Sequence, residues 1–182
     1  MERLNRTSAP QAKTYTEKVI QFGEGDFLRA FADWIICKTN HKTDFNASVV
    51  LVQPIEKGMV DNLNEQDGLY HLNLQGIDEG KPVDSLEMID VISRGLNPYR
   101  EFDSYLALAE QPQMRFIISN TTEAGIAFDP NCKFTDKPAS SYPGKLTQLL
   151  YHRFEYFKGD KSKGFIIMPC ELIFENGKHL KE

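Results

Sequence analysis

The chain has few of the residues that hold small secreted proteins or zinc-binding domains together. Its three cysteines, Cys37, Cys132 and Cys170, are odd in number, lie far apart and form no C-x-x-C pair. This spacing excludes a disulfide framework and contains no zinc motif. We therefore predict reduced thiols, a cytoplasmic location and no bound metal.

Long apolar runs and an excess of basic residues are also missing. No run approaches the roughly 20 apolar residues that a membrane-spanning helix needs. The N-terminal residues 1–13 are polar with alternating charge, unlike a secretory signal. The net charge is −5, whereas a nucleic-acid-binding protein needs a basic surface. We expect neither a membrane nor a nucleic acid as a partner.

The length of 182 residues suffices for one compact domain with its own core. We interpret residues 1–17 as an N-terminal tail or cap and residues 18–182 as the domain. Within the domain, the runs Lys18–Phe22 and Ser48–Val52 suggest buried strands. Between them, a helix is expected from residue 26 to about residue 38. Its predicted core face carries Phe27, Ala30, Phe31, Trp34 and Ile35.

The rest of the chain continues this alternation of short strands and helices. We predict further strands at 70–74, 87–93, 114–120 and 164–169, helices at 99–110 and after Pro143, and a long loop at 128–144. The sum is an α/β fold with a Rossmann-like, doubly wound, mostly parallel sheet. The segments 70–74 and 87–93 are expected to form a small antiparallel extension at its edge.

A glycine turn follows the first predicted strand, and the order strand, G-x-G turn, helix is typical of a dinucleotide pyrophosphate site. The first glycine permits the tight turn, the second lets the backbone approach the phosphates, and the helix N-terminus offers free N–H groups. Leu28 replaces the third glycine of the usual fingerprint, so a turn that binds nothing stays open as an alternative. The candidate cofactor-binding residues here are Gly23, Glu24, Gly25, Asp26, Phe27 and Arg29, with Asp26 also the expected helix cap.

Ligands of doubly wound sheets lie beyond the carboxyl ends of the strands, so polar residues that follow strands are further candidates. After the second strand, Gln53 or Glu56 could bind the adenosine ribose, where NAD-dependent domains usually place an acid. Neither residue decides between NAD and NADP. After the strand at 114–120, a polar run suits hydrogen bonds to ribose and the nicotinamide amide, with a capped turn as the alternative. That run is Asn120, Thr121, Thr122 and Glu123.

Three blocks of sequence together resemble a known family. They are Gly23–Phe31, Ser119–Gly125, and Pro169–Ile173 followed by Asn176-Gly177. In this order and spacing they resemble the N-terminal domain of the mannitol dehydrogenase family, the long-chain polyol dehydrogenases. The G-x-G-x-F-x-R turn of that family accounts for Leu28. The resemblance spans most of Val19–Gly177.

The resemblance implies that NAD(H) is the cofactor and that the full-length enzyme transfers a hydride between the nicotinamide and the keto carbon of a small sugar-acid substrate in hexuronate catabolism. It implies no metal. Asn176 matches the asparagine that helps to polarise the substrate carbonyl, although the polyol enzymes carry a further asparagine where this chain has Leu172.

The resemblance also implies a helical C-terminal domain that supplies the general acid/base lysine. The chain ends at Glu182, before that domain, so we expect a cofactor-binding fragment that is inactive alone. Two alternatives stay open. The parent protein could be another mannitol- or fructuronate-type dehydrogenase of the family, or the chain could be a non-catalytic nucleotide-binding module.

Overall fold

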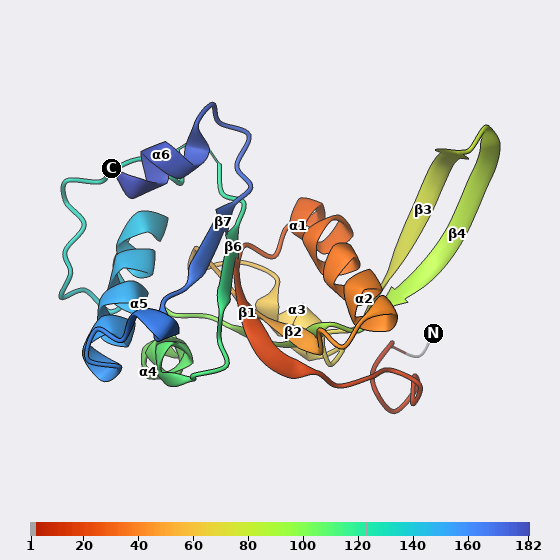
Figure 1. The fold of residues 1–182 in the computed structure, drawn as a ribbon, viewed down its shortest axis with the longest axis horizontal. Helices are drawn as coiled ribbons and strands as arrows, with labels where there is room; N and C mark the ends of the chain where they lie inside the picture. Colours follow the sequence, from red (N-terminus) through yellow and green to blue (C-terminus); the bar gives the residue numbers. More distant parts are fainter. Residues whose placement is uncertain (1–2, 123) are drawn as a thin grey trace.

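The computed structural model describes residues 3–122 and 124–182. Its centre is a five-stranded sheet with the order β5-β2-β1-β6-β7, and every neighbouring pair is parallel (Figure 1). Counted within this sheet alone, the order is 3-2-1-4-5, which reverses at β1 and opens a crevice at the carboxyl ends of β1 and β6. The strands are β1 (Thr16–Phe22), β2 (Ala47–Val52), β5 (Ile92–Leu96), β6 (Phe116–Ser119) and β7 (Ile166–Pro169).

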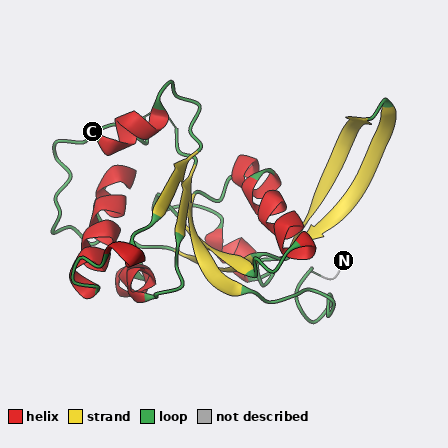
Figure 2. Cartoon of the chain, viewed as in Figure 1, coloured by secondary structure: helices red, strands yellow, loops and turns green. Residues whose placement is uncertain are grey.

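Helices cover both faces of the sheet, as Figure 2 shows. One face carries α1 (Asp26–Ala30), α2 (Ala32–Lys42) and α3 (Val60–Asn64), and the other carries α4 (Phe102–Ala107), the short helix η1 (Leu108–Glu110) and α5 (Tyr142–Tyr156). Successive residues of β1 fill opposite cores, because side chains alternate along a strand. Val19 packs with the α2 side and Ile20 with the α5 side. The doubly wound α/β prediction is confirmed.

The predicted antiparallel pair is confirmed, but it does not lie at the edge of the main sheet. β3 (Tyr70–Asp78) and β4 (Lys81–Ile89) form a separate two-stranded sheet that projects from the body (Figure 1). The predicted strand at 87–93 is in fact the end of β4 and the start of β5. The chain changes sheets at Asp90 and Val91, where the Val91 carbonyl already accepts the Val49 N–H of β2 at 2.9 Å.

The helix after the glycine turn buries a different face from the one predicted. It breaks at Phe31 into α1 and α2, and the buried apolar positions are Leu28, Ala32, Ile36 and Cys37. The predicted core residues Phe27, Phe31 and Ile35 are exposed by 45%, 49% and 42%. Both sets recur every four residues, so helical spacing alone does not choose between them.

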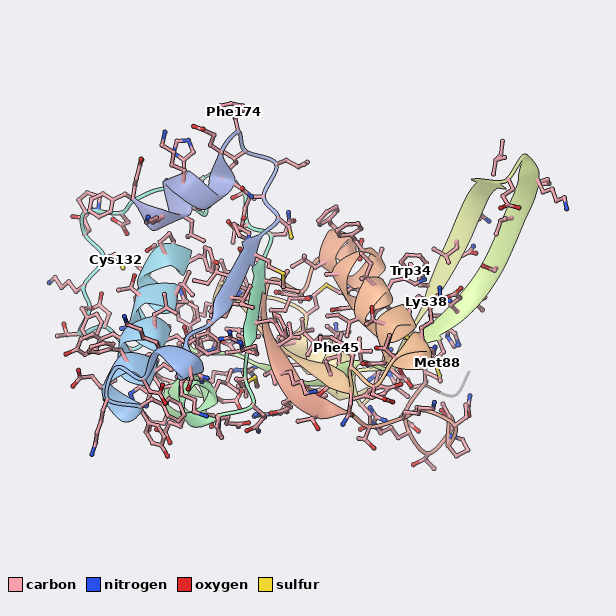
Figure 3. All side chains as sticks on the ribbon, in the orientation of Figure 1. Trp34, Lys38, Phe45, Met88, Cys132 and Phe174 are labelled. Atoms are coloured by element: carbon pink, nitrogen blue, oxygen red, sulfur yellow. The ribbon has the colours of Figure 1, made fainter. Side chains whose placement is uncertain are left out.

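Trp34 and Lys38 of α2 contact the β3–β4 hairpin. Figure 3 shows both side chains between α2 and the hairpin. Trp34 Nε1 donates to Glu87 at 3.0 Å, and Lys38 pairs with the same carboxylate at 2.6 Å. These contacts anchor the base of the hairpin to α2.

The ends of the chain pack against the domain. β1 begins at Thr16, so the last residues of the predicted tail belong to the sheet, and the Lys13 N–H donates to the Asp90 carboxylate at 2.9 Å. The short helix η2 (Lys161–Lys163) precedes β7, and α6 (Asn176–Lys181) follows it. Among the helices in the described residues, none is both long and apolar enough to cross a membrane.

Candidate functional site

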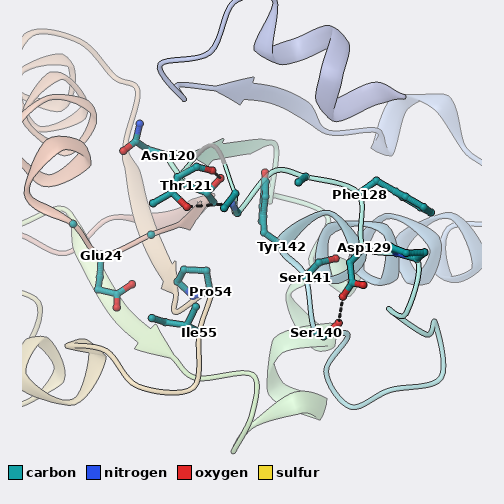
Figure 4. Close-up of a pocket in the computed structure, with 17 residues that line it drawn as sticks. Glu24, Pro54, Ile55, Asn120, Thr121, Phe128, Asp129, Ser140, Ser141 and Tyr142 are labelled. Carbon is teal, nitrogen blue, oxygen red and sulfur yellow. Dashed lines mark hydrogen bonds between the residues drawn. The ribbon is translucent and has the colours of Figure 1, made fainter.

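A cavity of about 620 Å³ lies at the carboxyl edge of the sheet, at the crevice that the strand order opens. Three strand ends contribute to it, and the start of α5 closes the far side (Figure 4). The residues that concern us are Gly23, Glu24 and Gly25 after β1, Pro54 and Ile55 after β2, Asn120, Thr121 and Thr122 after β6, and Ser141 and Tyr142 at α5.

Glycine occupies positions 23 and 25 of the turn for different structural reasons. Gly23 has φ +116°, a conformation that side chains rarely adopt, and a Cβ there would lie 3.2 Å from the Asn120 carbonyl oxygen. Gly25 has φ −69° and ψ 162°, which any residue adopts. A Cβ on Gly25 would meet no described atom within 4 Å. The fold therefore requires glycine at position 23 but not at position 25, and Gly25 lines the cavity.

Glu24 and Arg29 tie the turn together. The buried Glu24 carboxylate accepts the Met59 N–H at 3.4 Å, which joins the turn to the segment before α3. Arg29 Nε donates to the Glu24 carbonyl at 3.0 Å and its guanidinium pairs with Asp26. The prediction that Asp26 caps the helix is wrong, because Gly25 is the capping residue and the Asp26 carboxylate is held by Arg29.

Three predicted cofactor residues lie on α1, outside the cavity lining that the described residues form: Asp26, Phe27 and Arg29. Phe27 stacks on Phe31 with 5.4 Å between ring centroids and stays half-exposed. The structure thus places these three residues beside the cavity. Arg29 holds the conformation of the turn through its hydrogen bond to the Glu24 carbonyl.

Gln53 is buried and folds the loop after β2. Its amide donates to the carbonyls of Ile55 and Glu56 at 2.8 and 3.0 Å, and its oxygen accepts the Val60 N–H at 3.3 Å. With these groups engaged inward, Pro54 and Ile55 face the cavity in its place. Sequence reasoning passed over Pro54 and Ile55, although their position directly after a strand could have marked them.

The polar run after β6 is bound to the end of β7. Asn120 Nδ2 donates to the Cys170 carbonyl at 2.8 Å, and the Thr121 N–H donates to Glu171 Oε1 at 3.2 Å. The Thr122 hydroxyl accepts the Gly125 N–H at 3.1 Å. Glu123, the fourth predicted residue of this run, lies outside the described residues.

Asn176 binds the same segment from the other side. It is the first residue of α6, and its Nδ2 donates to the carbonyls of Pro169 and Glu171 at 2.9 and 3.1 Å. The structure therefore brings Asn120, Thr121 and Asn176 together around residues 169–171.

Tyr142 is a cavity residue that sequence reasoning missed, because position 142 falls in the predicted loop. The Ser141 hydroxyl accepts the Gly144 N–H at 3.1 Å and so starts α5 before Pro143. This cap could have been read from Ser141-Tyr142-Pro143.

One group of metal-ligand side chains lies close together among the described residues: Cys37, His41 and Asp90, with ligand atoms within 4.8 Å of one another. The Cys37 thiol lies 3.8 Å from Asp90 Oδ1 and donates to it. Burial and the neighbouring Asp90 carboxylate raise the pKa of Cys37 to about 11, so the sulfur is a neutral donor at neutral pH. These residues belong to α2 and the β4–β5 link and do not line the cavity.

A comparison with known families assigns the chain to one of them. The family model of the mannitol dehydrogenase Rossmann domain matches residues 17–182. The chain belongs to this family. The resemblance carried by the glycine turn and the two later strand-end blocks is thereby confirmed.

Curated relatives are longer than this chain. An altronate oxidoreductase of Bacteroides thetaiotaomicron is 70% identical over 182 residues, which are all of this chain and 38% of the relative. The altronate oxidoreductase of Bacillus subtilis is 48% identical over the same length and share. The chain thus spans less than two-fifths of these relatives. Among solved structures, the mannitol 2-dehydrogenase of Pseudomonas fluorescens, in a ternary complex with NAD and D-mannitol, shares the fold with a TM-score of 0.78 and 19% identity, over 99% of this chain and 41% of that one.

Proposed function

We propose that this chain is the cofactor-binding domain of an NAD-dependent altronate oxidoreductase, also called tagaturonate reductase. The full-length protein would transfer a hydride between the nicotinamide and the keto carbon of the sugar acid in hexuronate catabolism. The observation that carries the proposal is the 70% identity, over the whole chain, with the altronate oxidoreductase of Bacteroides thetaiotaomicron. The match covers 38% of that relative, so the role proposed for these residues is to bind and orient NAD(H).

The cavity supports this role by its position and its lining. A dinucleotide would place its pyrophosphate at the Gly23–Gly25 turn, where the missing side chain of Gly25 leaves room for phosphate oxygens against the backbone. The adenosine would lie over Pro54 and Ile55 at the end of β2, and the nicotinamide at the ends of β6 and β7. The bound cofactor supplies the hydride chemistry, and the protein supplies its position.

For Asn176 we keep the proposed role at the substrate carbonyl. Its Nδ2 now donates to two backbone carbonyls, so polarising a substrate would redirect the N–H that binds the Glu171 carbonyl at 3.1 Å. We also propose a cytoplasmic location, since free thiols such as those of Cys37, Cys132 and Cys170 persist in reducing compartments.

The cofactor role is tested by titrating the 182-residue chain with NADH and with NADPH, followed by the fluorescence of the bound nucleotide. We expect saturable binding of NADH that is weakened at least about tenfold by Gly25→Val, because the new side chain occupies the phosphate space. Gly76→Val is the matched control, since a Cβ on Gly76 in β3 also meets no described atom within 4 Å. Absence of saturable binding, or equal affinity in the Gly25 variant, contradicts the proposal.

The substrate is tested in the full-length parent protein. We expect NADH oxidation that depends on tagaturonate and is faster than with fructuronate or fructose. Faster turnover of fructose would assign the parent to a polyol-type activity of the same family.

A further inference from the structure

Three buried polar atoms at the carboxyl edge of the sheet have no hydrogen-bond partner among the described residues. They are Ser119 Oγ, Tyr142 Oη and Glu171 Oε2. The residues come from the end of β6, the start of α5 and the segment after β7, and their exposed fractions are 0%, 4% and 5%. Burying one such atom without a partner costs about 1–3 kcal/mol, so three in one place call for an explanation.

The backbone brings two of these residues together, because the N–H of Cys170, next to Glu171, donates to the Ser119 carbonyl at 2.8 Å. Burial raises the pKa of Tyr142, the nearby Ser119 hydroxyl opposes the rise, and the negative charge of Glu171 adds to it. The two hydroxyls do not meet the geometry of a hydrogen bond. Among the described residues, no cation pairs with Glu171.

Of the three residues, Tyr142 lines the cavity, and Glu171 borders it through its hydrogen bond with the lining residue Thr121. Tyr142 lines the cavity itself, alongside the segment of Asn120 and Thr121 in Figure 4. Thr121 also lines it, and its N–H and hydroxyl supply the hydrogen bonds that the structure records to the Glu171 carboxylate, at 3.2 and 3.5 Å. One oxygen of the Glu171 carboxylate thus binds the cavity wall, and the other has no hydrogen-bond partner in the part of the chain that the structure describes.

We propose that Ser119, Tyr142 and Glu171 form the subsite for the primary carboxamide of the nicotinamide ring. This assignment rests on the proposed function. A carboxamide has two N–H donors and one carbonyl acceptor. Glu171 Oε2 accepts an N–H, and the hydroxyls of Tyr142 and Ser119 donate to the carbonyl oxygen.

Position and charge favour this ligand group over the others in a dinucleotide. The acid that binds the adenosine ribose in such domains follows the second strand, so the nicotinamide belongs on the opposite side, at β6 and β7. A carboxylate without a cation repels the phosphates, whereas it accepts hydrogen bonds from a neutral amide. Glu171 thereby selects a nicotinamide cofactor and, through Thr121, sets the wall that the ring rests on.

The test compares Glu171→Gln and Tyr142→Phe with the unaltered chain, using three ligands. ADP-ribose lacks the nicotinamide, and the 3-acetylpyridine analogue of NADH replaces the amide nitrogen by a methyl group. We expect each variant to weaken NADH binding by about tenfold and to leave ADP-ribose affinity within about twofold. Glu171→Gln should not weaken the acetylpyridine analogue further, because that ligand has no N–H to lose.

Tyr15→Phe is the matched control, since the Tyr15 hydroxyl is also buried and without a partner among the described residues, but lies outside the cavity lining. It should change none of the three affinities. Equal losses of NADH and ADP-ribose in the Glu171 and Tyr142 variants would overturn the subsite, since the trio would then only shape the cavity. Unchanged NADH affinity would overturn it as well and would indicate a trapped water. Failure of the unaltered chain to bind ADP-ribose would instead overturn the proposed function, and the subsite with it.

Discussion

Arg29 Nε donates a hydrogen bond to the backbone carbonyl of Glu24 at 3.0 Å, which ties the first turn of α1 to the glycine turn before it. The guanidinium also pairs with Asp26 and lies 5.4 Å from the centroid of the Tyr70 ring. The Arg29 side chain is only 15% exposed. Arg29 therefore fixes the conformation of the turn from a position outside the cavity lining that the described residues form.

Replacing Arg29 by lysine tests this role. Lysine keeps the charge but loses the planar fork, so Arg29→Lys should lower the free energy of unfolding by about 1–2 kcal/mol and weaken NADH about fivefold. Urea unfolding and NADH titration measure the two effects. Arg100→Lys is the control, because the pair of Arg100 with Asp61 is exposed and contributes little. Weaker binding without any loss of stability would mean that Arg29 contacts a phosphate directly.

The buried face of α1 leads to a second prediction. Leu28→Ala should lower the free energy of unfolding by about 2–4 kcal/mol, because it opens a cavity in the core. Phe27→Ala, one position earlier, should lower it by less than about 1 kcal/mol, because the Phe27 ring is already 45% exposed. Urea unfolding of the two variants measures the difference. The reverse order would show that the stripe of Phe27 and Phe31 is the one that packs against the sheet.

The sheet and the glycine turn could be predicted from the sequence because their signals are local. β1 and β2 are short apolar runs bounded by turn residues, and the conformation of Gly23 depends on a few neighbouring bonds. The buried helix face could not be predicted. Leu28 and Phe27 start stripes with the same spacing of four residues, and only contact with the sheet and the hairpin chooses between them.

The residues of the candidate site also divide into those that the sequence predicts and those that depend on tertiary structure. Asn120 and Thr121 were predicted because polar residues that follow a strand are visible in the sequence. Tyr142 and Glu171 were missed as cavity-side residues because their meeting depends on tertiary structure. β7 pairs with β6 in a register that sets Pro169 against Ser119, and this brings Glu171 to Thr121 from 50 residues away.

Asp33 makes the stability of the domain depend on pH. It is fully buried in α2, and the Tyr70 hydroxyl donates to its carboxylate at 3.3 Å. Burial raises the pKa of Asp33 to about 7, against the opposing effects of Tyr70, Gln21 and the charge of Arg29. In the unfolded chain an aspartate ionises near pH 4. The free energy of unfolding should therefore be highest below about pH 4 for this group, fall as the pH rises to about 7 and then level off.

Asp33→Asn removes this dependence, because asparagine does not ionise. The free energy of unfolding of the variant minus that of the unaltered chain should increase between about pH 4 and about pH 7, by at most about 4 kcal/mol. Urea unfolding across this range measures it, and Asp44→Asn, at an exposed position, is the control for the rest of the chain. Parallel curves for Asp33→Asn and the unaltered chain would place the pKa of Asp33 near its ordinary value.

Arg153 supports the site from the opposite end of the sheet. Its guanidinium is buried and donates to four backbone carbonyls: Ala109, Gln111 and Met114 at 2.9, 3.0 and 2.9 Å, and Lys163. These carbonyls belong to the segments that lead into β6 and β7. One side chain thus fixes the starting points of the two strands whose other ends carry Asn120 and Glu171.

Lysine cannot reach four carbonyls that lie in different directions, so Arg153→Lys leaves several buried acceptors without a donor. We expect the free energy of unfolding to fall by about 3 kcal/mol or more, measured by urea unfolding. Arg115→Lys is the matched control, because Arg115 donates to the Gly164 carbonyl nearby but is exposed, and it should lower the free energy by less than about 1 kcal/mol. Equal effects of the two substitutions would show that Arg153 does not fix the starts of β6 and β7. Arg153 differs from Arg115 in being buried and in binding more carbonyls.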